Sequence, residues 1–312
     1  MPKIAVVGAG NVGASAALYA AEAELGDVVL VDILEGVAKG KALDLLEAGP
    51  VRHYDSLVEG SGDIRAIEGS DLIIVTAGLP RKPGMSRLDL LKANADIIRG
   101  VAEAIRDNAK NAFVILVTNP LDVMTYLTFR ITGFPRERVM GMAGVLDSSR
   151  FRTFIAQEIG VSVEEVHAMV LGGHGDTMVP LLRYSTISGI PVENFIKKER
   201  LAEIVQRTRD GGAEIVKLLQ TGSAFYAPAS SAVQMAEAIL RDKKRLLPVA
   251  AHLQGEYGFR DLFLGVPAIL GSRGIEKIVE LELTAEEKSA LAKSVEEVKK
   301  GIADLALEPV AH

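Results

Sequence analysis

The residue best placed for acid–base chemistry is His174, in the segment LGGHGD at 171–176. The glycines beside it let the backbone turn and leave the imidazole open to a small ligand. An imidazole titrates near neutral pH, so such a histidine can give and take a proton in a reaction. A turn histidine that only hydrogen-bonds the backbone is the alternative for a lone residue of this type.

A second group of polar residues stands at 147–150, with the sequence DSSR. Asp147 and Arg150 are three residues apart and share one face of the helix expected there. A carboxylate could orient an imidazole, and a guanidinium could bind a carboxylate. The same spacing is common in surface ion pairs, so this group alone leaves both interpretations open.

Cations gather in the segment GLPRKPGMSR at 78–87, although the net charge of the chain is −6. Arg81 and Arg87 have no acid beside them, and two prolines and two glycines interrupt regular structure. Ser86 and Asp89 form a capping box that predicts a helix beginning at Arg87. We expect a lid that delivers both arginines to an anionic substrate. A mobile loop with incidental cations is the alternative, and Lys82 is expected to be a solvated charge.

A glycine-rich turn follows the first apolar run. The sequence GAGNVG matches G-x-G-x-x-G between an expected strand and an expected helix, where free N–H groups can bind a pyrophosphate. Asp32 ends the second strand about 20 residues on, where a carboxylate accepts from ribose hydroxyls and repels the extra phosphate of NADP. We therefore predict NAD as the cofactor, rather than a turn that binds nothing. The residues predicted to contact it here are Gly8, Ala9, Gly10, Asn11, Val12, Gly13 and Asp32.

Several other classes of site are disfavoured. The segment 36–41 lacks P-loop spacing, no Tyr-x-x-x-Lys or H-E-x-x-H motif occurs, and the chain has no cysteine, so we expect no metal site. The acidic charge argues against nucleic acid and anionic membranes as partners. No apolar run reaches the roughly 18 residues of a membrane span. With no signal peptide recognised at the N-terminus, a cytoplasmic location is expected.

Alternating strand and helix patterns predict a doubly wound parallel sheet of the Rossmann type at 1–144. A mixed α+β substrate domain is predicted at 145–312. The strands of the first part are expected at 4–7, 28–31, 72–76, 114–118 and 139–142. Later strands are expected at 166–171, 184–188, 246–251, 262–264 and 275–279. Thr284 and Glu287 form a second capping box, which opens a terminal helix.

Six motifs together resemble the lactate/malate dehydrogenase family, in its lactate-dehydrogenase-like malate dehydrogenase branch. They are GAGNVG, Asp32, GLPRKPGMSR, TNPLD at 118–122, DSSR and GGHGD, and TGSAFYAP at 221–228 and LGVPAILG at 264–271 extend the likeness. The resemblance implies that His174 is the general acid/base and that Asp147 orients it. It implies that Arg150 binds the substrate carboxylate, that Arg87 polarises the carbonyl, and that Asn119 contacts substrate and cofactor. Further cofactor contacts implied by the resemblance are Asn94, Val117 and Thr118.

Arg81 is expected to decide the substrate. The resemblance places arginine here in the malate branch and typically glutamine in the lactate branch. A guanidinium would pair with the second carboxylate of oxaloacetate, which pyruvate lacks. The predicted activity is interconversion of (S)-malate and oxaloacetate. A lactate or broader 2-hydroxyacid dehydrogenase and a non-catalytic NAD-binding protein are the alternatives. The family also implies a homotetramer or homodimer.

Overall fold

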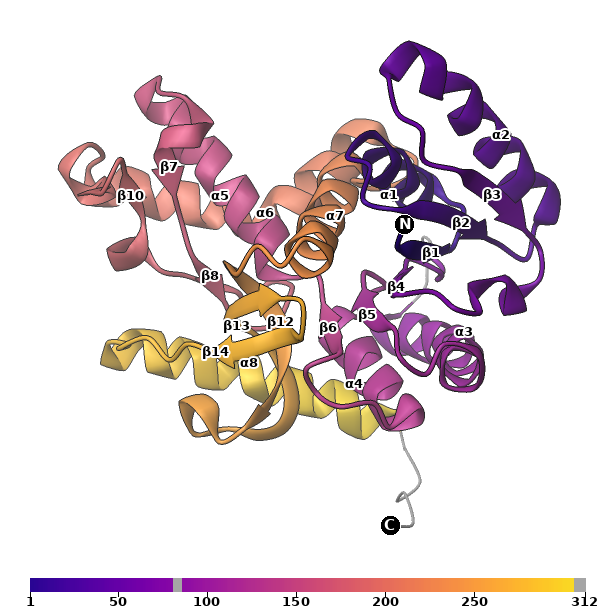
Figure 1. Ribbon diagram of the computed structural model, residues 1–312. Helices are drawn as coiled ribbons and strands as arrows, with labels where there is room; N and C mark the ends of the chain where they lie inside the picture. Colours follow the sequence, from indigo (N-terminus) through magenta and orange to yellow (C-terminus); the bar gives the residue numbers. More distant parts are fainter. Residues whose placement is uncertain (81–85, 306–312) are drawn as a thin grey trace.

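Six parallel strands form the centre of the first half of the chain (Figure 1). The computed structural model describes residues 1–80 and 86–305. The strands stand in the order β3-β2-β1-β4-β5-β6, and every neighbouring pair is parallel. This is the doubly wound order, which confirms the predicted fold class. Their bounds are β1 Lys3–Val7, β2 Asp27–Val31, β3 Val58–Ser61, β4 Leu72–Val75, β5 Phe113–Leu116 and β6 Val139–Gly141.

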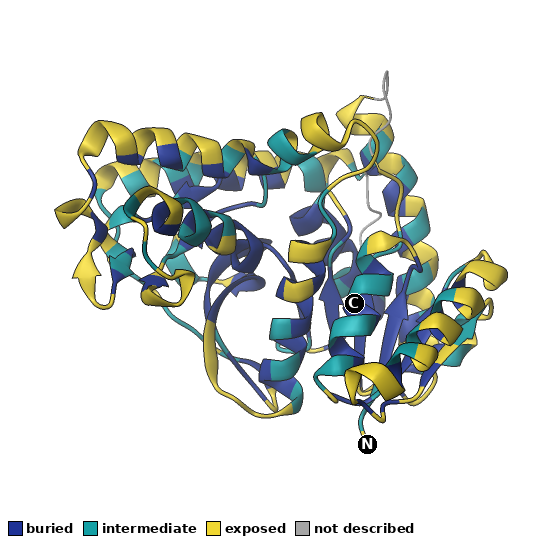
Figure 2. Ribbon diagram, turned by 90° about the horizontal axis from the view of Figure 1, so that it is seen from above, coloured by how far each residue is buried: buried dark blue, intermediate teal, exposed yellow. Residues whose placement is uncertain are grey.

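Helices cover both faces of this sheet, because its strands are apolar on both sides. In β1, Ile4 and Val6 join one buried cluster with the helices α1, α2 and α7, whereas Ala5 and Val7 join another with α3 and α4. Apart from the edge strand β3, the strands are accordingly almost wholly buried (Figure 2). The helices of the first half are α1 Asn11–Glu22, α2 Glu35–Arg52, α3 Arg87–Asn108 and α4 Leu121–Thr132.

Both predicted capping boxes are present. The Ser86 hydroxyl accepts from the backbone N–H of Asp89 at 3.1 Å, and the Asp89 carboxylate accepts from the backbone N–H of Ser86 at 3.1 Å. α3 therefore begins at Arg87, as predicted. Thr284 and Glu287 make the equivalent pair of bonds at the start of α8.

The second half mixes long helices with an antiparallel hairpin. The helices are α5 Gly144–Ile159, α6 Lys198–Leu219, α7 Tyr226–Leu240 and α8 Ala285–Asp304, and the larger strands are β12 Arg245–Gln254, β13 Arg260–Gly271 and β14 Gly274–Ile278. Short strands complete it: β7 Val166–His167, β8 Val170–Leu171, β9 Val179–Pro180, β10 Thr186–Ile187 and β11 Ile190–Pro191. No helix among the described residues is long and apolar enough to cross a membrane.

The strands predicted in the second half differ from the structure in their bounds. The strand expected at 184–188 is reduced to β10, and the strand expected at 246–251 is extended to β12. The strand expected at 166–171 is divided into β7 and β8, which lie in different sheets. The division arises because the N–H of Val170 donates to the Ser148 hydroxyl, while the carbonyl of Met169 accepts from Leu181. The strand expected at 262–264 is longer, since pairing with β12 continues past Gly265 and Pro267.

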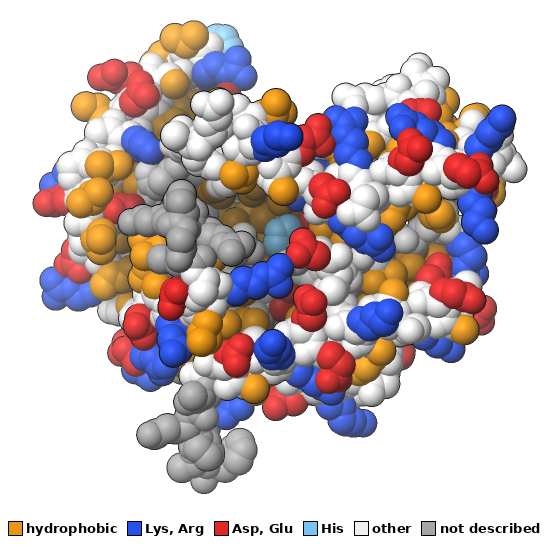
Figure 3. Space-filling model, turned by 180° about the vertical axis from the view of Figure 1, so that it is seen from behind, with side chains coloured by type: hydrophobic (Ala, Val, Ile, Leu, Met, Phe, Trp, Pro, Cys, Tyr) orange, Lys and Arg blue, Asp and Glu red, His pale blue; other side chains and the backbone are white. Residues whose placement is uncertain are grey.

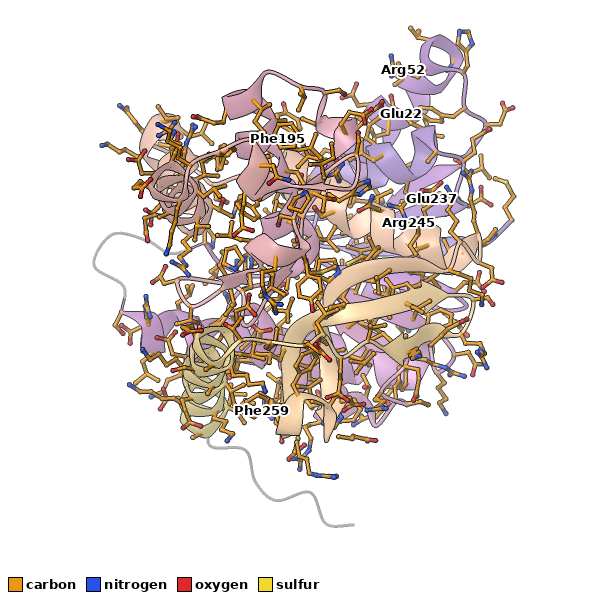
Figure 4. All side chains as sticks on the ribbon, turned by 90° about the vertical axis from the view of Figure 1, so that its left-hand side faces the viewer. Glu22, Arg52, Phe195, Glu237, Arg245 and Phe259 are labelled. Carbon is orange, nitrogen blue, oxygen red and sulfur yellow. The ribbon has the colours of Figure 1, made fainter. Side chains whose placement is uncertain are left out.

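The two halves share one sheet and a helical interface. Ala250 of β12 pairs with Gly141 of β6, so β12, β13 and β14 extend the parallel sheet beyond residue 144. α7, which belongs to the second half, packs on α1 of the first half. Within the first half, an ion pair between Arg52 Nε and Glu22 Oε1 at 2.6 Å joins α2 to α1 (Figure 4). The sheet thereby brings side chains from both halves together at the carboxyl ends of β4 and β5.

Candidate active site

The glycine turn, residues 8–13, connects β1 to α1. Gly8 has a φ of +107°, and a Cβ there would lie 2.6 Å from the Thr76 hydroxyl. A Cβ on Gly13 would lie 1.8 Å from the carbonyl oxygen of Gly8. A Cβ on Gly10 would meet nothing within 4 Å. Gly8 and Gly13 are thus required by the packing of the protein itself, whereas Gly10 leaves room in front of the α1 N-terminus for a phosphate.

Asp32 lies beside this turn, directly after β2. Its carboxylate accepts from the N–H of Ala9 at 2.7 Å and from that of Leu34 at 2.9 Å. The Lys41 ammonium donates to the carbonyl of Ala9 at 2.8 Å. No sequence motif pointed to Lys41, because the segment 36–41 lacks P-loop spacing. The turn therefore has an anion and a cation at its edge.

The segments after β4 and β5 are tied together by Asn94 of α3. Its amide accepts from the N–H of Leu79 at 2.7 Å and donates to the carbonyl of Asn119 at 2.7 Å. Thr118 donates to the carbonyl of Ala77 at 2.7 Å. Asn94 is buried and uses its amide on backbone groups, so it supports the Asn119 segment. Val117 is half-buried and Asn119 is exposed, and the peptide between Asn119 and Pro120 is cis.

His174, Asp147 and Arg150 meet in the structure. The Nδ1 of His174 is 3.0 Å from Oδ2 of Asp147, and NH1 of Arg150 is 3.8 Å from the other oxygen of that carboxylate. Burial disfavours the charged imidazole, but the charge and hydrogen bond of Asp147 outweigh it and raise the pKa of His174. Because Nδ1 is held by Asp147, Nε2 is the nitrogen left to exchange a proton with a ligand.

The His174 turn, residues 172–177, is fixed by three consecutive backbone N–H groups. Gly172 donates to the carbonyl of Gly265 on β13 at 2.9 Å, and Gly173 donates to the Ser294 hydroxyl on α8 at 2.7 Å. The N–H of His174 donates to Asp122 on α4 at 2.8 Å. None of Gly265, Ser294 and Asp122 was predicted to act at the site, although Asp122 belongs to TNPLD and Gly265 to LGVPAILG, two segments of the family resemblance.

Arg150 lies against two adjacent glycines of α6. A Cβ on Gly211 would be 3.0 Å from Cδ of Arg150, and a Cβ on Gly212 would be 3.7 Å from its terminal nitrogens. The Arg150 side chain is only 13% exposed, and its Nε has no hydrogen-bond partner within residues 1–80 and 86–305. Burial lowers the pKa of the guanidinium, with Asp147 opposing. A buried cation with a free N–H is suited to an anionic ligand.

His174 lines a cleft of about 730 Å³ that reaches the start of α3, and its other lining residues include Arg87, Asn119, Asp122 and Asp176. Figure 3 shows a histidine at the floor of a hollow with acidic and basic side chains at its rim. Arg87 is at this rim rather than on His174, because its NH2 is 2.9 Å from the Asp176 carboxylate. Arg81 and Lys82 lie outside the described residues.

The residues predicted from sequence therefore fall into two groups. Those of the glycine turn, with Asp32, lie at the end of β1 and β2, and those around His174 lie at the end of β4 and β5 with α5. Within the described part of the chain, no three His, Asp or Glu side chains gather in a way that could hold a metal ion. The arrangement suits an extended dinucleotide along the strand ends and a small anion beside His174 and Arg150.

Comparisons with known proteins agree with this geometry. Residues 2–141 match the family model described as lactate/malate dehydrogenase, NAD binding domain. Residues 144–308 match that of the lactate/malate dehydrogenase alpha/beta C-terminal domain. A malate dehydrogenase of Roseiflexus sp. (strain RS-1) is 58% identical over 304 residues, which covers 97% of this chain and 98% of that protein.

Solved structures of both branches are similar to this chain. A malate dehydrogenase from Cryptosporidium parvum has a TM-score of 0.96 at 45% identity, covering 98% of this chain and 99% of that one. A lactate dehydrogenase from the same organism, solved with lactic acid and nicotinamide adenine dinucleotide, has a TM-score of 0.95 at 45% identity and covers 99% of each chain. Matches over both halves of the chain, together with the site geometry, show that it belongs to the lactate/malate dehydrogenase family.

Proposed function

We propose that the protein is an NAD-dependent malate dehydrogenase that interconverts (S)-malate and oxaloacetate. The observation that carries the proposal is the buried group of His174, Asp147 and Arg150, whose histidine lines a cleft together with Asn119. The 58% identity to a protein named malate dehydrogenase supports the choice of substrate. The proposed division is an NAD-binding domain at 1–144 and a substrate domain at 145–312.

The cofactor fits the residues at the glycine turn. Gly10 leaves space before the first N–H groups of α1, and Asp32, beside this turn, would accept from the hydroxyls of the adenine ribose. The predicted contacts of Ala9, Asn11 and Val12 belong to the same turn, and Asn94 would act by holding Asn119 in place. When bound, NADH supplies a hydride to the carbonyl carbon of the substrate. Asp32 favours NAD over NADP because its charge repels a 2′-phosphate.

The chain's own residues handle the proton and the carboxylates. Protonated His174 donates the proton on Nε2 to the substrate oxygen as the carbonyl is reduced, and Asp147 stabilises the cation before transfer. Arg150 binds the carboxylate next to the reacting carbon through its guanidinium. Arg87 leaves Asp176 and stabilises the charge that develops on the carbonyl oxygen. Arg81 pairs with the distal carboxylate of oxaloacetate.

Turnover with two substrates tests the proposal. The absorbance of NADH is followed with oxaloacetate and with pyruvate, for the wild type and for Arg81→Gln. We expect oxaloacetate to be preferred, and the variant to lose on the order of 30-fold or more of that preference, as for a desolvated ion pair that loses one partner. Preference for pyruvate in the wild type would indicate a lactate dehydrogenase. NADH binding without turnover would indicate a binding protein.

Assembly and location stay predictions from the sequence. The family resemblance implies a homodimer or homotetramer, and light scattering of the purified protein distinguishes these from a monomer. Malate and oxaloacetate are the proposed small-molecule partners. A cytoplasmic location is proposed and is tested by fractionating cells that express the protein.

A further inference from the structure

Two buried carboxylates contact His174, and only one of them contacts its ring. Asp147 is hydrogen-bonded to Nδ1. Asp122 accepts from the backbone N–H of the same residue at 2.8 Å, although it stands 52 positions earlier in the chain. Asp122 belongs to the first turn of α4, directly after the Asn119 segment. It therefore links the carboxyl end of β5 to the residue proposed to move the proton.

The position of Asp122 is unusual for a carboxylate. It is 5% exposed, and its Oδ1 has no hydrogen-bond partner among the residues that the structure describes. Burial raises its pKa to about 6, and the hydrogen bond from His174 opposes that rise. The start of a helix favours a negative charge, which offsets part of the cost of burial. A group kept there at such a cost points to a role beyond packing.

We propose that Asp122 is a positioning residue for His174. It fixes the backbone of the His174 turn against α4, and its negative charge stabilises the protonated imidazole. The inference rests on the proposed function, because it concerns the residue that transfers the proton there. It also connects the Asn119 segment and the His174 turn into one unit, so that cofactor-side and substrate-side groups are held in register.

Other charges surround the imidazole, and their effects on the pKa of His174 must be distinguished from that of Asp122. Asp147 on α5 favours the protonated ring, and Arg150 on the same helix disfavours it. Asp122 favours the protonated ring as well. Further charged groups of the cleft are Asp176 on the His174 turn, Arg87 on α3, and Glu297, Lys300 and Asp304 on α8. A test therefore needs a control that removes a charge from the same cleft without touching the turn.

Three variants separate charge from anchoring. Asp122→Asn keeps an oxygen that can accept from the His174 N–H but removes the charge. Ser294→Ala removes the other side-chain anchor of the turn, the acceptor of the Gly173 N–H, and leaves every charge in place. Asp304→Asn removes a carboxylate from the α8 side of the cleft. The double backbone pairing of Gly172 and Gly265 is retained in all three.

The measured quantity is the pKa of His174, from nuclear magnetic resonance of its imidazole, with the resonance assigned by its loss in His174→Gln. We expect Asp122→Asn to lower this pKa by about half a unit or more, in the direction expected for losing a nearby opposite charge. The fall of kcat/KM for oxaloacetate with rising pH should move to lower pH together with the pKa of His174. Ser294→Ala and Asp304→Asn should leave the pKa in place.

An unchanged pKa in folded Asp122→Asn, or equal shifts in all three variants, would overturn the inference. If Asp122→Asn does not fold, the wild-type Asp122 carboxyl is titrated by carbon resonance with and without His174→Gln. Loss of the imidazolium should then raise the pKa of Asp122, and no change would overturn the inference. The resonance measurements need no turnover, so failure of the proposed activity is a separate result.

Discussion

Arg87 of α3 and Asp176 of the His174 turn form an ion pair, with 2.9 Å between NH2 and Oδ2. Both side chains are about three-quarters exposed, at 75% and 76%. An exposed pair of this kind contributes about 0–1 kcal/mol to stability. Asp176 therefore holds Arg87 only weakly, two residues from His174, and an anionic substrate competes with it for the same guanidinium.

Replacing Asp176 with Asn should strengthen substrate binding. The variant frees Arg87 and removes a negative charge near a dianionic substrate, so we expect KM for oxaloacetate to fall by up to about fivefold. Steady-state kinetics at low salt measure this effect, which should shrink at high salt through screening. Asp304→Asn is the matched control in the same cleft and should change KM less. A higher KM in Asp176→Asn would contradict competition for Arg87.

The raised pKa of His174 sets the pH dependence of both reaction directions. Oxaloacetate reduction needs the protonated imidazole, so kcat/KM should be full at low pH and fall as pH rises through a value above about 6.5. Malate oxidation needs the neutral imidazole and should rise across the same range. The stabilisation from the His174–Asp147 pair should likewise be lost as pH rises through the raised pKa.

Asp147→Asn should move the pH dependence of oxaloacetate reduction and that of malate oxidation to lower pH. It should also lower kcat by at least about a hundredfold, since the imidazole loses its charged partner. The profile is measured with NADH and oxaloacetate, and with NAD and malate. Ser149→Ala, on the exposed side of the same helix, is the control and should leave the profile in place. If the pH dependence of both reactions in Asp147→Asn is the same as in the wild type, Asp147 does not raise the pKa of His174.

Asp32 is predicted to discriminate between NAD and NADP. Asp32→Ser removes both the charge and the hydrogen bonds to Ala9 and Leu34, so the ratio of kcat/KM for NAD over NADP should fall at least about tenfold. Asp32→Asn removes the charge but keeps an acceptor for the Ala9 N–H. If charge repulsion decides, both variants lower the ratio. An unchanged ratio in both would remove Asp32 from this role.

Gly211 and Gly212 offer a matched pair of variants. Alanine favours a helix over glycine by about 1 kcal/mol at either position. Gly211→Ala would place its Cβ 3.0 Å from Cδ of Arg150, whereas Gly212→Ala makes contacts of ordinary length. We expect Gly211→Ala to raise KM for oxaloacetate about tenfold, as for a misaligned charge-assisted hydrogen bond. Gly212→Ala should raise the melting temperature and leave KM unchanged, and equal KM values would contradict this account.

Local patterns were reliable where the relevant contacts are local. The glycine turn and both capping boxes involve residues within a few positions of one another, so propensity and spacing predicted them. The strand expected at 166–171 failed because its partners are Ser148 and Leu181, outside any local window. The full length of β13 was missed because Pro267 disfavours a strand locally, although pairing with β12 forms one.

The amino-acid sequence by itself determined most of the alternation of strands and helices in the first half, the glycine turn and the chemically capable residues, since each of these follows from residue type and short spacing. The edge strand β3, with the sequence VEGS, was not predicted because it lacks an apolar run. Only the tertiary structure decided which groups support them. Asp122, Ser294 and Gly265 reach the His174 turn from separate elements, and Gly211 reaches Arg150 from α6. Such contacts depend on how the sheet and helices pack in three dimensions, and no spacing along one chain specifies that packing.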